Sequence, residues 1–187
     1  MTDCASPRTR PPTAERCRRI LERHGVPEHI QRHSEQVARV VRALADHLGR
    51  AAAGPLDAEL LVAAALLHDV AKADCFDSGK DHAREGGRLL RQMGMDAVAA
   101  LVERHVELGG WNPEGPVTEA EVLNYGDKRV RHDEVVSLDE RFRDLLERYG
   151  TRYPEARGRI LANWRFSKEL EKKIFARLPV GPDFLGR

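Results

Sequence analysis

Cysteine is scarce in this sequence of 187 residues, and the cysteines Cys4, Cys17 and Cys75 form no CxxC pair. Three cysteines cannot all be paired in disulfides, which favours a reducing cytoplasm. No apolar run reaches the length that spans a membrane. The first residues, MTDCASPRTRPPT, also lack the apolar segment of a secretory signal. We therefore predict a cytoplasmic protein with no membrane partner.

The chain also has almost no net charge. Its 31 basic side chains nearly cancel its 30 acidic ones, which leaves a formal net charge of +1. This balance gives no general attraction to nucleic acid or to an anionic membrane surface. We expect a small-molecule partner and no nucleic-acid partner, whereas the sequence leaves the oligomeric state open.

Helical periodicity is present along nearly the whole chain, and no stretch shows the alternation of a half-buried strand. Capping-box patterns begin at Thr118 and Ser137, and Asp57, Asp81 and Asp96 are positioned to cap further helices. The sequence predicts helices over 14–25, 27–50, 58–72, 82–94, 97–110, 119–132, 138–150 and 154–178.

These helices predict an all-α, single-domain fold over residues 13–187, because a chain of this length can build one sizeable core. The segment 58–72 is apolar nearly all round, which is typical of a central buried helix. Residues 1–12 are expected to be a disordered leader.

Several ionisable side chains fall on the apolar faces of these predicted helices. They are His33, His68 at the end of the central helix, His105, and Asp127. A buried imidazole or carboxylate without a partner is costly. These groups could satisfy one another by converging on a divalent cation, for which imidazole and carboxylate are usual ligands. Each histidine alone could equally be a hydrogen-bonded core residue.

The ordered motifs RHSEQVARVV, ALLHDVAK and NYGDKRV carry more weight than any single residue. With these motifs the chain resembles the HD-domain superfamily of metal-dependent phosphohydrolases, over about residues 27–131. The resemblance implies an all-helical domain in which His33, His68, Asp69 and Asp127 are metal ligands. A second His-Asp pair, at 132–133, lies in a polar segment and is expected outside this cluster.

Two further histidines, His82 and His105, stand where two-metal branches of the superfamily insert extra ligands. In this respect the chain is similar to the bacterial bis(nucleosyl)tetraphosphatase-like branch. The resemblance implies two divalent ions, iron or manganese, with Asp69 bridging them; magnesium, cobalt, nickel and zinc are further candidates. The alternative is a single ion, with His82 an ordinary first-turn residue.

The implied function is metal-dependent phosphohydrolysis of a phosphorylated small molecule, such as a nucleotide or a dinucleoside polyphosphate. A metal-activated water would attack phosphorus. Asp69 and Lys72 would be catalytic, and Lys72, Lys128 and Arg131 would bind phosphate. Lys128 and Arg131 could equally be surface charges, and whether Arg141 faces the site stays open. Two other functions on the same scaffold are a non-catalytic binding or sensory module and a di-iron oxygenase.

Overall fold

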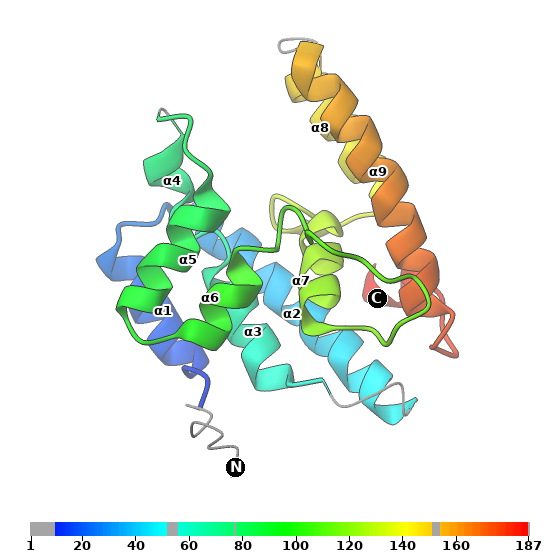
Figure 1. Cartoon of the computed structure of the whole chain (residues 1–187), viewed down its shortest axis with the longest axis horizontal. Coiled ribbons are helices and arrows are strands. Elements are labelled where there is room, and N and C mark those ends of the chain that lie inside the picture. The colour runs from blue at the N-terminus through cyan, green and yellow to red at the C-terminus, as the bar shows by residue number, and fades with distance from the viewer. Residues whose placement is uncertain (1–9, 52–55, 77, 151–153, 187) are drawn as a thin grey trace, which may run out of the picture.

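The computed structural model describes residues 10–51, 56–76, 78–150 and 154–186. Apart from residues 10–12, the predicted leader lies outside the described residues. As Figure 1 shows, helices make up most of the described part of the chain. This part also contains a single short β-hairpin. The elements are α1 (Ala14–Arg23), α2 (Glu28–Arg50), α3 (Ala58–Leu67), α4 (Lys72–Cys75), α5 (His82–Gln92), α6 (Asp96–Val102), α7 (Glu119–Lys128), β1 (Val130–Arg131), β2 (Glu134–Val135), α8 (Leu138–Leu145), the π-helical turn η1 (Leu146–Gly150), α9 (Pro154–Phe175) and the 3-10 turn η2 (Pro182–Gly186).

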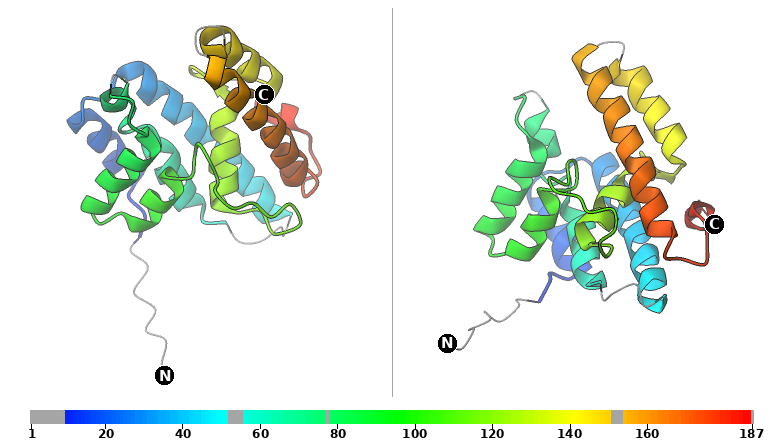
Figure 2. Two further views of the ribbon diagram at one scale, coloured as in Figure 1. Left: turned by 45° about the horizontal axis from the view of Figure 1, so that its top comes forward. Right: turned by 45° about the vertical axis from the view of Figure 1, so that its right-hand side comes forward.

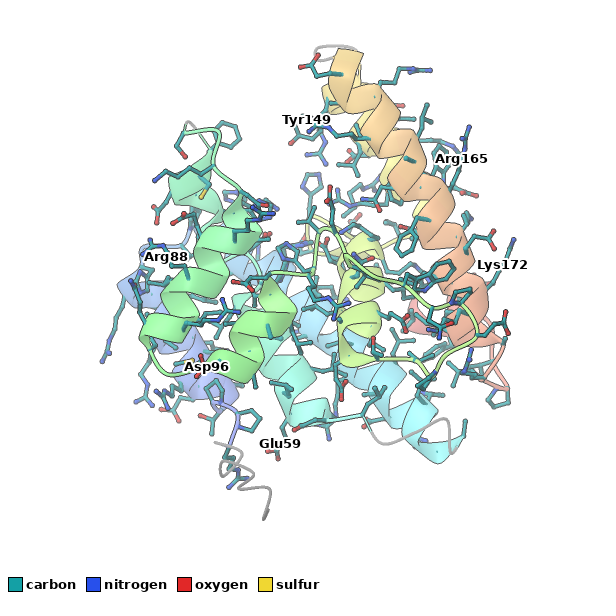
Figure 3. All side chains as sticks on the ribbon, in the orientation of Figure 1. Glu59, Arg88, Asp96, Tyr149, Arg165 and Lys172 are labelled. Carbon is teal, nitrogen blue, oxygen red and sulfur yellow. The ribbon has the colours of Figure 1, made fainter. Side chains whose placement is uncertain are left out.

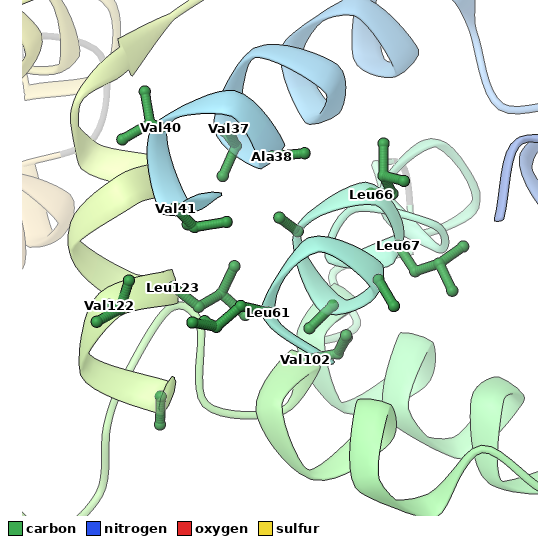
Figure 4. Close-up of a cluster of buried hydrophobic side chains, with 14 of the residues drawn as sticks. Val37, Ala38, Val40, Val41, Leu61, Leu66, Leu67, Val102, Val122 and Leu123 are labelled. Carbon is green, nitrogen blue, oxygen red and sulfur yellow. The ribbon is translucent and has the colours of Figure 1, made fainter. Parts of the chain in front are cut away.

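The predicted central helix is confirmed as α3, which contacts α1, α2, α6 and α7. Its residues from Ala63 to Leu67 are all buried. Figure 4 shows Leu61 and Leu67 of this helix among side chains of its neighbours, including Val41 and Leu123. The carboxyl end of α3 therefore places His68 and Asp69 in the middle of the fold. Within the described residues, no helix is long and apolar enough to cross a membrane.

Most of the predicted helix starts are confirmed. Thr118 and Ser137 both form complete capping boxes, and the side chains of Asp57 and Asp81 accept hydrogen bonds at the starts of α3 and α5. The predicted cap Asp96 is wrong, because Asp96 is already the first residue of α6. An acidic residue in that first turn still stabilises the helix through its dipole.

Several predicted helices end a few residues early, and three of them end four or more residues before the predicted end without continuing as another helical turn. The predicted helix 58–72 breaks at His68 and the predicted helix 97–110 ends at Val102. In both cases a histidine ring replaces the continuing chain as hydrogen-bond partner of a helical carbonyl: His68 Nδ1 lies 2.7 Å from Ala65 O, and His105 Nδ1 lies 2.7 Å from Val102 O.

The third helix, α7, ends at Lys128, and the chain then reverses through the β1–β2 hairpin. His132, in the turn of this hairpin, has a φ of 56°, which is uncommon for a residue other than glycine. Strands of two residues are too short to show an alternating pattern, so the sequence did not predict them.

Helices α2 and α7 approach closely at Gly126. A Cβ atom at this position would lie 2.6 Å from Val41 Cγ1. The absence of a side chain at Gly126 therefore lets α7 pack directly on α2, which brings the neighbouring residue Asp127 to His33 of α2.

The C-terminal helices α8 and α9 pack side by side and project from the same side of the molecule as α4 (Figures 1 and 2). Buried polar contacts attach α9 to α7. Lys173 Nζ lies 2.6 Å from Glu121 Oε1, and the Tyr125 hydroxyl donates to Glu171 at 2.7 Å. These contacts determine the position of α8 and η1 relative to the carboxyl end of α3.

Candidate metal centre

The six predicted metal ligands come from separate segments of the chain and meet at the carboxyl end of α3. His33 lies on α2, and His68 and Asp69 lie in the turn between α3 and α4. The other ligands are His82, the first residue of α5; His105, just after α6; and Asp127, near the end of α7.

One group of side chains, which we call the first cluster, contains His33, His68, Asp127 and Oδ2 of Asp69. His33 Nε2 lies 3.1 Å from Asp127 Oδ1, and His68 Nε2 lies 3.6 Å from the same oxygen. His68 Nε2 is also 3.4 Å from Asp69 Oδ2. All four residues are buried, and His33, His68 and Asp127 form a geometry that could hold a metal ion.

A second cluster contains His82, His105 and Oδ1 of Asp69. The Nε2 atoms of the two histidines are 3.2 Å apart. They lie 3.4 Å and 3.7 Å, respectively, from Asp69 Oδ1. The two oxygens of Asp69 thus face different clusters. His105 and Asp69 can also be grouped with His68 as a set able to hold a metal ion.

Backbone carbonyls orient three of the imidazole rings. His33 Nδ1 lies 2.8 Å from the carbonyl oxygen of His132, while His68 and His105 use the helical carbonyls described above. A carbonyl can only accept, so each Nδ1 carries a proton and donates it. In the neutral ring this leaves the Nε2 lone pair free toward the clusters, which is the usual arrangement of a metal-binding histidine.

The side chains fit a divalent cation on two grounds. First, His68 Nε2 and Asp69 Oδ1 are buried and have no hydrogen-bond partner in the described structure, which is unusual for buried polar atoms. Second, two atoms that each lie about 2.1 Å from one ion at about 90–110° are roughly 3.0–3.5 Å apart. The spacings within both clusters match this range or exceed it slightly. Imidazole with carboxylate suits transition metals such as iron, manganese and zinc.

Opposing effects determine the charge of the buried groups. Burial alone would raise the pKa of Asp69 and Asp127, but His68 and Lys72 beside Asp69, and Lys128 beside Asp127, hold both pKa values well below the usual range. Both carboxylates are therefore anionic near neutral pH.

The two innermost histidines are shifted in opposite directions. Burial lowers the pKa of His68, but the carboxylates of Asp69 and Asp127 more than offset this and raise it to about 10. Burial and the neighbouring charge of His68 lower the pKa of His105 to about 3. The protein alone therefore balances its buried carboxylates partly with a proton on His68, which a bound dication would replace.

The predicted phosphate-binding residues have different surroundings. Lys72 Nζ donates to Asp69 Oδ2 at 2.7 Å, and its side chain is 44% exposed and lines a cavity beside the first cluster. Lys128 is buried, with Nζ 2.6 Å from Asp127 Oδ2 and 3.2 Å from the His105 carbonyl. Arg131 pairs with Glu134 at 3.3 Å and does not line the cavity. Phosphate binding by these residues stays a prediction, and the structure favours Lys72 for it.

The cavity has a volume of about 720 Å³ and includes His33 and Asp69 in its lining. Its other walls include α4 with the residue after it and α8 with η1, and they contribute residues that the sequence pattern did not single out: Phe76, Arg148 and Tyr149. Arg141, which the sequence left open, also lines it. No local motif distinguishes these residues, because they meet only through packing of distant segments.

The second His-Asp pair lies beside the first cluster. As expected, neither His132 nor Asp133 is in the groups of side chains that could hold an ion. However, both line the cavity, and the backbone carbonyl of His132 contacts His33. The pair therefore contributes to the surroundings of the site through its backbone and its position in the hairpin turn.

Comparison with known protein families gives an HD domain over residues 30–152, a range that includes all six candidate ligands. The chain belongs to the HD-domain family, whose members are generally metal-dependent phosphohydrolases.

Among curated proteins, the chain is similar to a tRNA (cytidine(56)-2'-O)-methyltransferase of Picrophilus torridus, with 30% identity over 147 residues. The similarity covers 74% of this chain but 41% of the methyltransferase, so the chain spans about two fifths of that relative's length.

Proposed function

We propose that this protein is a metal-dependent phosphohydrolase that acts on a phosphorylated small molecule, a nucleotide or a dinucleoside polyphosphate. The observation that carries the proposal is the convergence of six buried or half-buried histidine and aspartate residues on two adjacent clusters that share Asp69. Membership of the HD-domain family supports it.

Each side chain has a role in the proposal. His33, His68 and Asp127, with Oδ2 of Asp69, would hold one divalent ion, and His82 and His105, with Oδ1 of Asp69, would hold a second. When bound, such ions would supply an acidified water as nucleophile and neutralise negative charge on the phosphoryl oxygens.

Two lysines support the clusters in different ways. Lys72 keeps Asp69 anionic and extends from it into the cavity, where its remaining N–H groups can donate to a phosphate oxygen. Lys128 donates to Asp127 and to the carbonyl of His105, so it positions residues of both clusters. We therefore assign substrate binding to Lys72 and a positioning role to Lys128.

Three other functions are less well supported. Methyl transfer, the activity named for the curated relative, gives no reason for a buried set of cation ligands in this chain. A binding or sensory module would hold metal without turnover. A di-iron oxygenase would hold iron and consume oxygen. Metal analysis, phosphate release and oxygen uptake, measured on the same preparation, separate these functions from the proposed one.

The decisive experiment measures phosphate release from ATP and from glycerol 3-phosphate with added Mn²⁺. We expect Asp69→Asn to lose activity to background while its circular dichroism keeps the helical signal. The matched control Asp46→Asn changes an exposed carboxylate on α2 and should keep full activity. Undiminished turnover by Asp69→Asn would contradict the proposal.

Lys72 can be tested in the same assay. Lys72→Ala should weaken substrate binding, seen as a raised KM, more than it weakens metal binding, because an ammonium group cannot ligate a cation. Lys172→Ala, which removes an exposed lysine of α9, is the control and should change neither. Loss of bound metal in Lys72→Ala, with KM unchanged, would contradict the role assigned to Lys72.

A further inference from the structure

The two histidines of the second cluster are held in different ways. The side chain of His82 is 27% exposed and begins helix α5, whereas that of His105 is 2% exposed and follows the end of α6. His105 therefore lies on the loop 103–118 and not within a helix. The contact of its Nδ1 with the Val102 carbonyl orients the ring, but the backbone that follows must be fixed by other contacts.

Helix α7 supplies these contacts. The loop crosses α7 on its way from α6 (Figure 3), and two side chains of α7 donate to its carbonyl oxygens. Asn124 Nδ2 lies 2.9 Å from the oxygen of His105 and 3.2 Å from that of Val106. Lys128 Nζ lies 3.2 Å from the same oxygen of His105. Residues four apart share one face of a helix, so Asn124 and Lys128 together hold the loop against α7.

The amide of Asn124 is explained by this contact and not by packing. Asn124 is fully buried, and its Oδ1 has no hydrogen-bond partner in the described part of the chain. A buried acceptor without a partner costs stability, and a leucine of similar size would avoid that cost. Leucine cannot donate to the two carbonyls, however, whereas the amide nitrogen of asparagine can donate to both.

Asn124 acts on one cluster, whereas its neighbour Lys128 acts on both. Lys128 Nζ also lies 2.6 Å from Oδ2 of Asp127, a residue of the first cluster. Both hydrogen bonds from the Asn124 amide go to the loop that carries His105. Loss of the Asn124 amide should therefore disturb the second cluster and leave the first in place.

We propose that Asn124 is a positioning residue for the second metal ion. By fixing the backbone at 105–106, it keeps Nε2 of His105 3.2 Å from Nε2 of His82 and 3.7 Å from Oδ1 of Asp69. Asn124 does not ligate an ion and acts through His105. The inference rests on the proposed two-ion function and adds the residue on which the second ion depends.

The test loads the full-length protein with Mn²⁺. Elemental analysis gives the bound metal, calorimetric titration gives the affinity for each ion, and electron paramagnetic resonance detects magnetic coupling between two neighbouring ions. Asn124→Leu removes both donors, and Asn124→Asp places a carboxylate against the two carbonyls. Each variant should bind one ion in place of two, lose the coupled signal and keep its affinity for the first ion. The second ion should bind about 10–100-fold more weakly, the usual effect of losing a group that supports a metal ligand.

Tyr125→Phe is the matched control. Tyr125 is the next residue of α7 and is fully buried, and its hydroxyl forms hydrogen bonds with Glu171 at 2.7 Å and with Arg129 at 2.6 Å. The variant should unfold at a lower urea concentration than the wild type and should still bind two coupled ions.

The outcomes separate this inference from the function on which it rests. Two ions bound with wild-type affinity in Asn124→Leu would overturn it. Equal weakening of both ions, or loss of the second ion in Tyr125→Phe, would also overturn it, because the packing of α7 would then be responsible. If the wild type binds two ions but releases no phosphate from ATP, the proposed hydrolase fails, whereas selective loss of the second ion in the Asn124 variants still supports the inference. If the wild type binds a single ion, the inference fails, and phosphate release decides the hydrolase separately.

Discussion

Replacement of Gly126 by alanine tests how the packing of α7 on α2 positions the candidate metal centre. Alanine at a helical position is normally favourable by about 0.8–1 kcal/mol relative to glycine. Here the new Cβ would lie 2.6 Å from Val41 Cγ1, and Val41 is fully buried and β-branched, so it has little freedom to move. Overpacking of this kind costs about 1–3 kcal/mol. The difference between the two effects predicts a net loss of roughly 0–2 kcal/mol in the free energy of unfolding.

The same substitution should weaken metal binding. Asp127 follows Gly126 directly, and relief of the contact moves α7 away from α2 and lengthens the 3.1 Å separation between Asp127 Oδ1 and His33 Nε2. Urea unfolding of the metal-free protein and calorimetric titration with Mn²⁺ measure the two effects separately.

Two controls isolate the packing effect. A Cβ added at Gly158 of α9 would meet no atom within 4 Å, so Gly158→Ala should gain about 0.5–1 kcal/mol and leave metal affinity unchanged. In a Val41→Ala background, Gly126→Ala should become stabilising, because the space is then available. If Gly126→Ala stabilises the wild type as much as Gly158→Ala does, with unchanged affinity, the reasoning is refuted.

Three further predictions concern the clusters and the attachment of α9. His105→Ala should lower the bound metal measured by elemental analysis from two ions per chain toward one, as should His82→Ala; a wild-type content of one ion, unchanged in both variants, would rule out the second site. Because the pKa of His68 is raised from 6.5 to about 10, metal uptake at pH 8 should release a proton, detected as a dependence of the calorimetric heat on the buffer's ionisation enthalpy; equal heats in all buffers would contradict this. The same shift stabilises the metal-free protein fully below pH 6.5, and this contribution is lost as the pH rises through about 10. Lys173→Met removes the cationic partner of the buried Glu121 carboxylate, to which the Thr118 N–H still donates, and should cost about 3–5 kcal/mol in urea unfolding. Glu121→Gln in the same chain should recover part of that loss; a cost below about 1 kcal/mol would show that the pair is unimportant.

The sequence predicted those parts of the site that local pattern determines. His33 falls on the apolar face of a long amphipathic helix, and His68 and Asp69 end a helix that is apolar all round, so their burial was readable from periodicity. The helix ends next to His68 and before His105 could not be read from periodicity. Both rings form hydrogen bonds with backbone carbonyls that the periodic pattern assigns to a continuing helix.

The cavity could not be predicted because its walls depend on tertiary contacts. Arg141, Arg148 and Tyr149 belong to a segment with ordinary helical patterning. Whether this segment faces the site depends on how α9 attaches to α7, for example through Glu121 and Lys173, which are separated by 52 residues. No local sequence pattern predicts a contact between residues so far apart in the chain.

The separation of the cluster residues along the chain also determines when the candidate metal centre can form during synthesis. His33 and Asp127 are 94 residues apart. Because translation proceeds from the N-terminus, His33, His68 and Asp69 are all made before α7, and until α7 docks on α2 the first cluster lacks one of its carboxylates. Contacts of such long range close late, since a long loop must be ordered first. Tight binding of metal would therefore indicate that the chain has completed its fold. A nascent or truncated chain would release the metal.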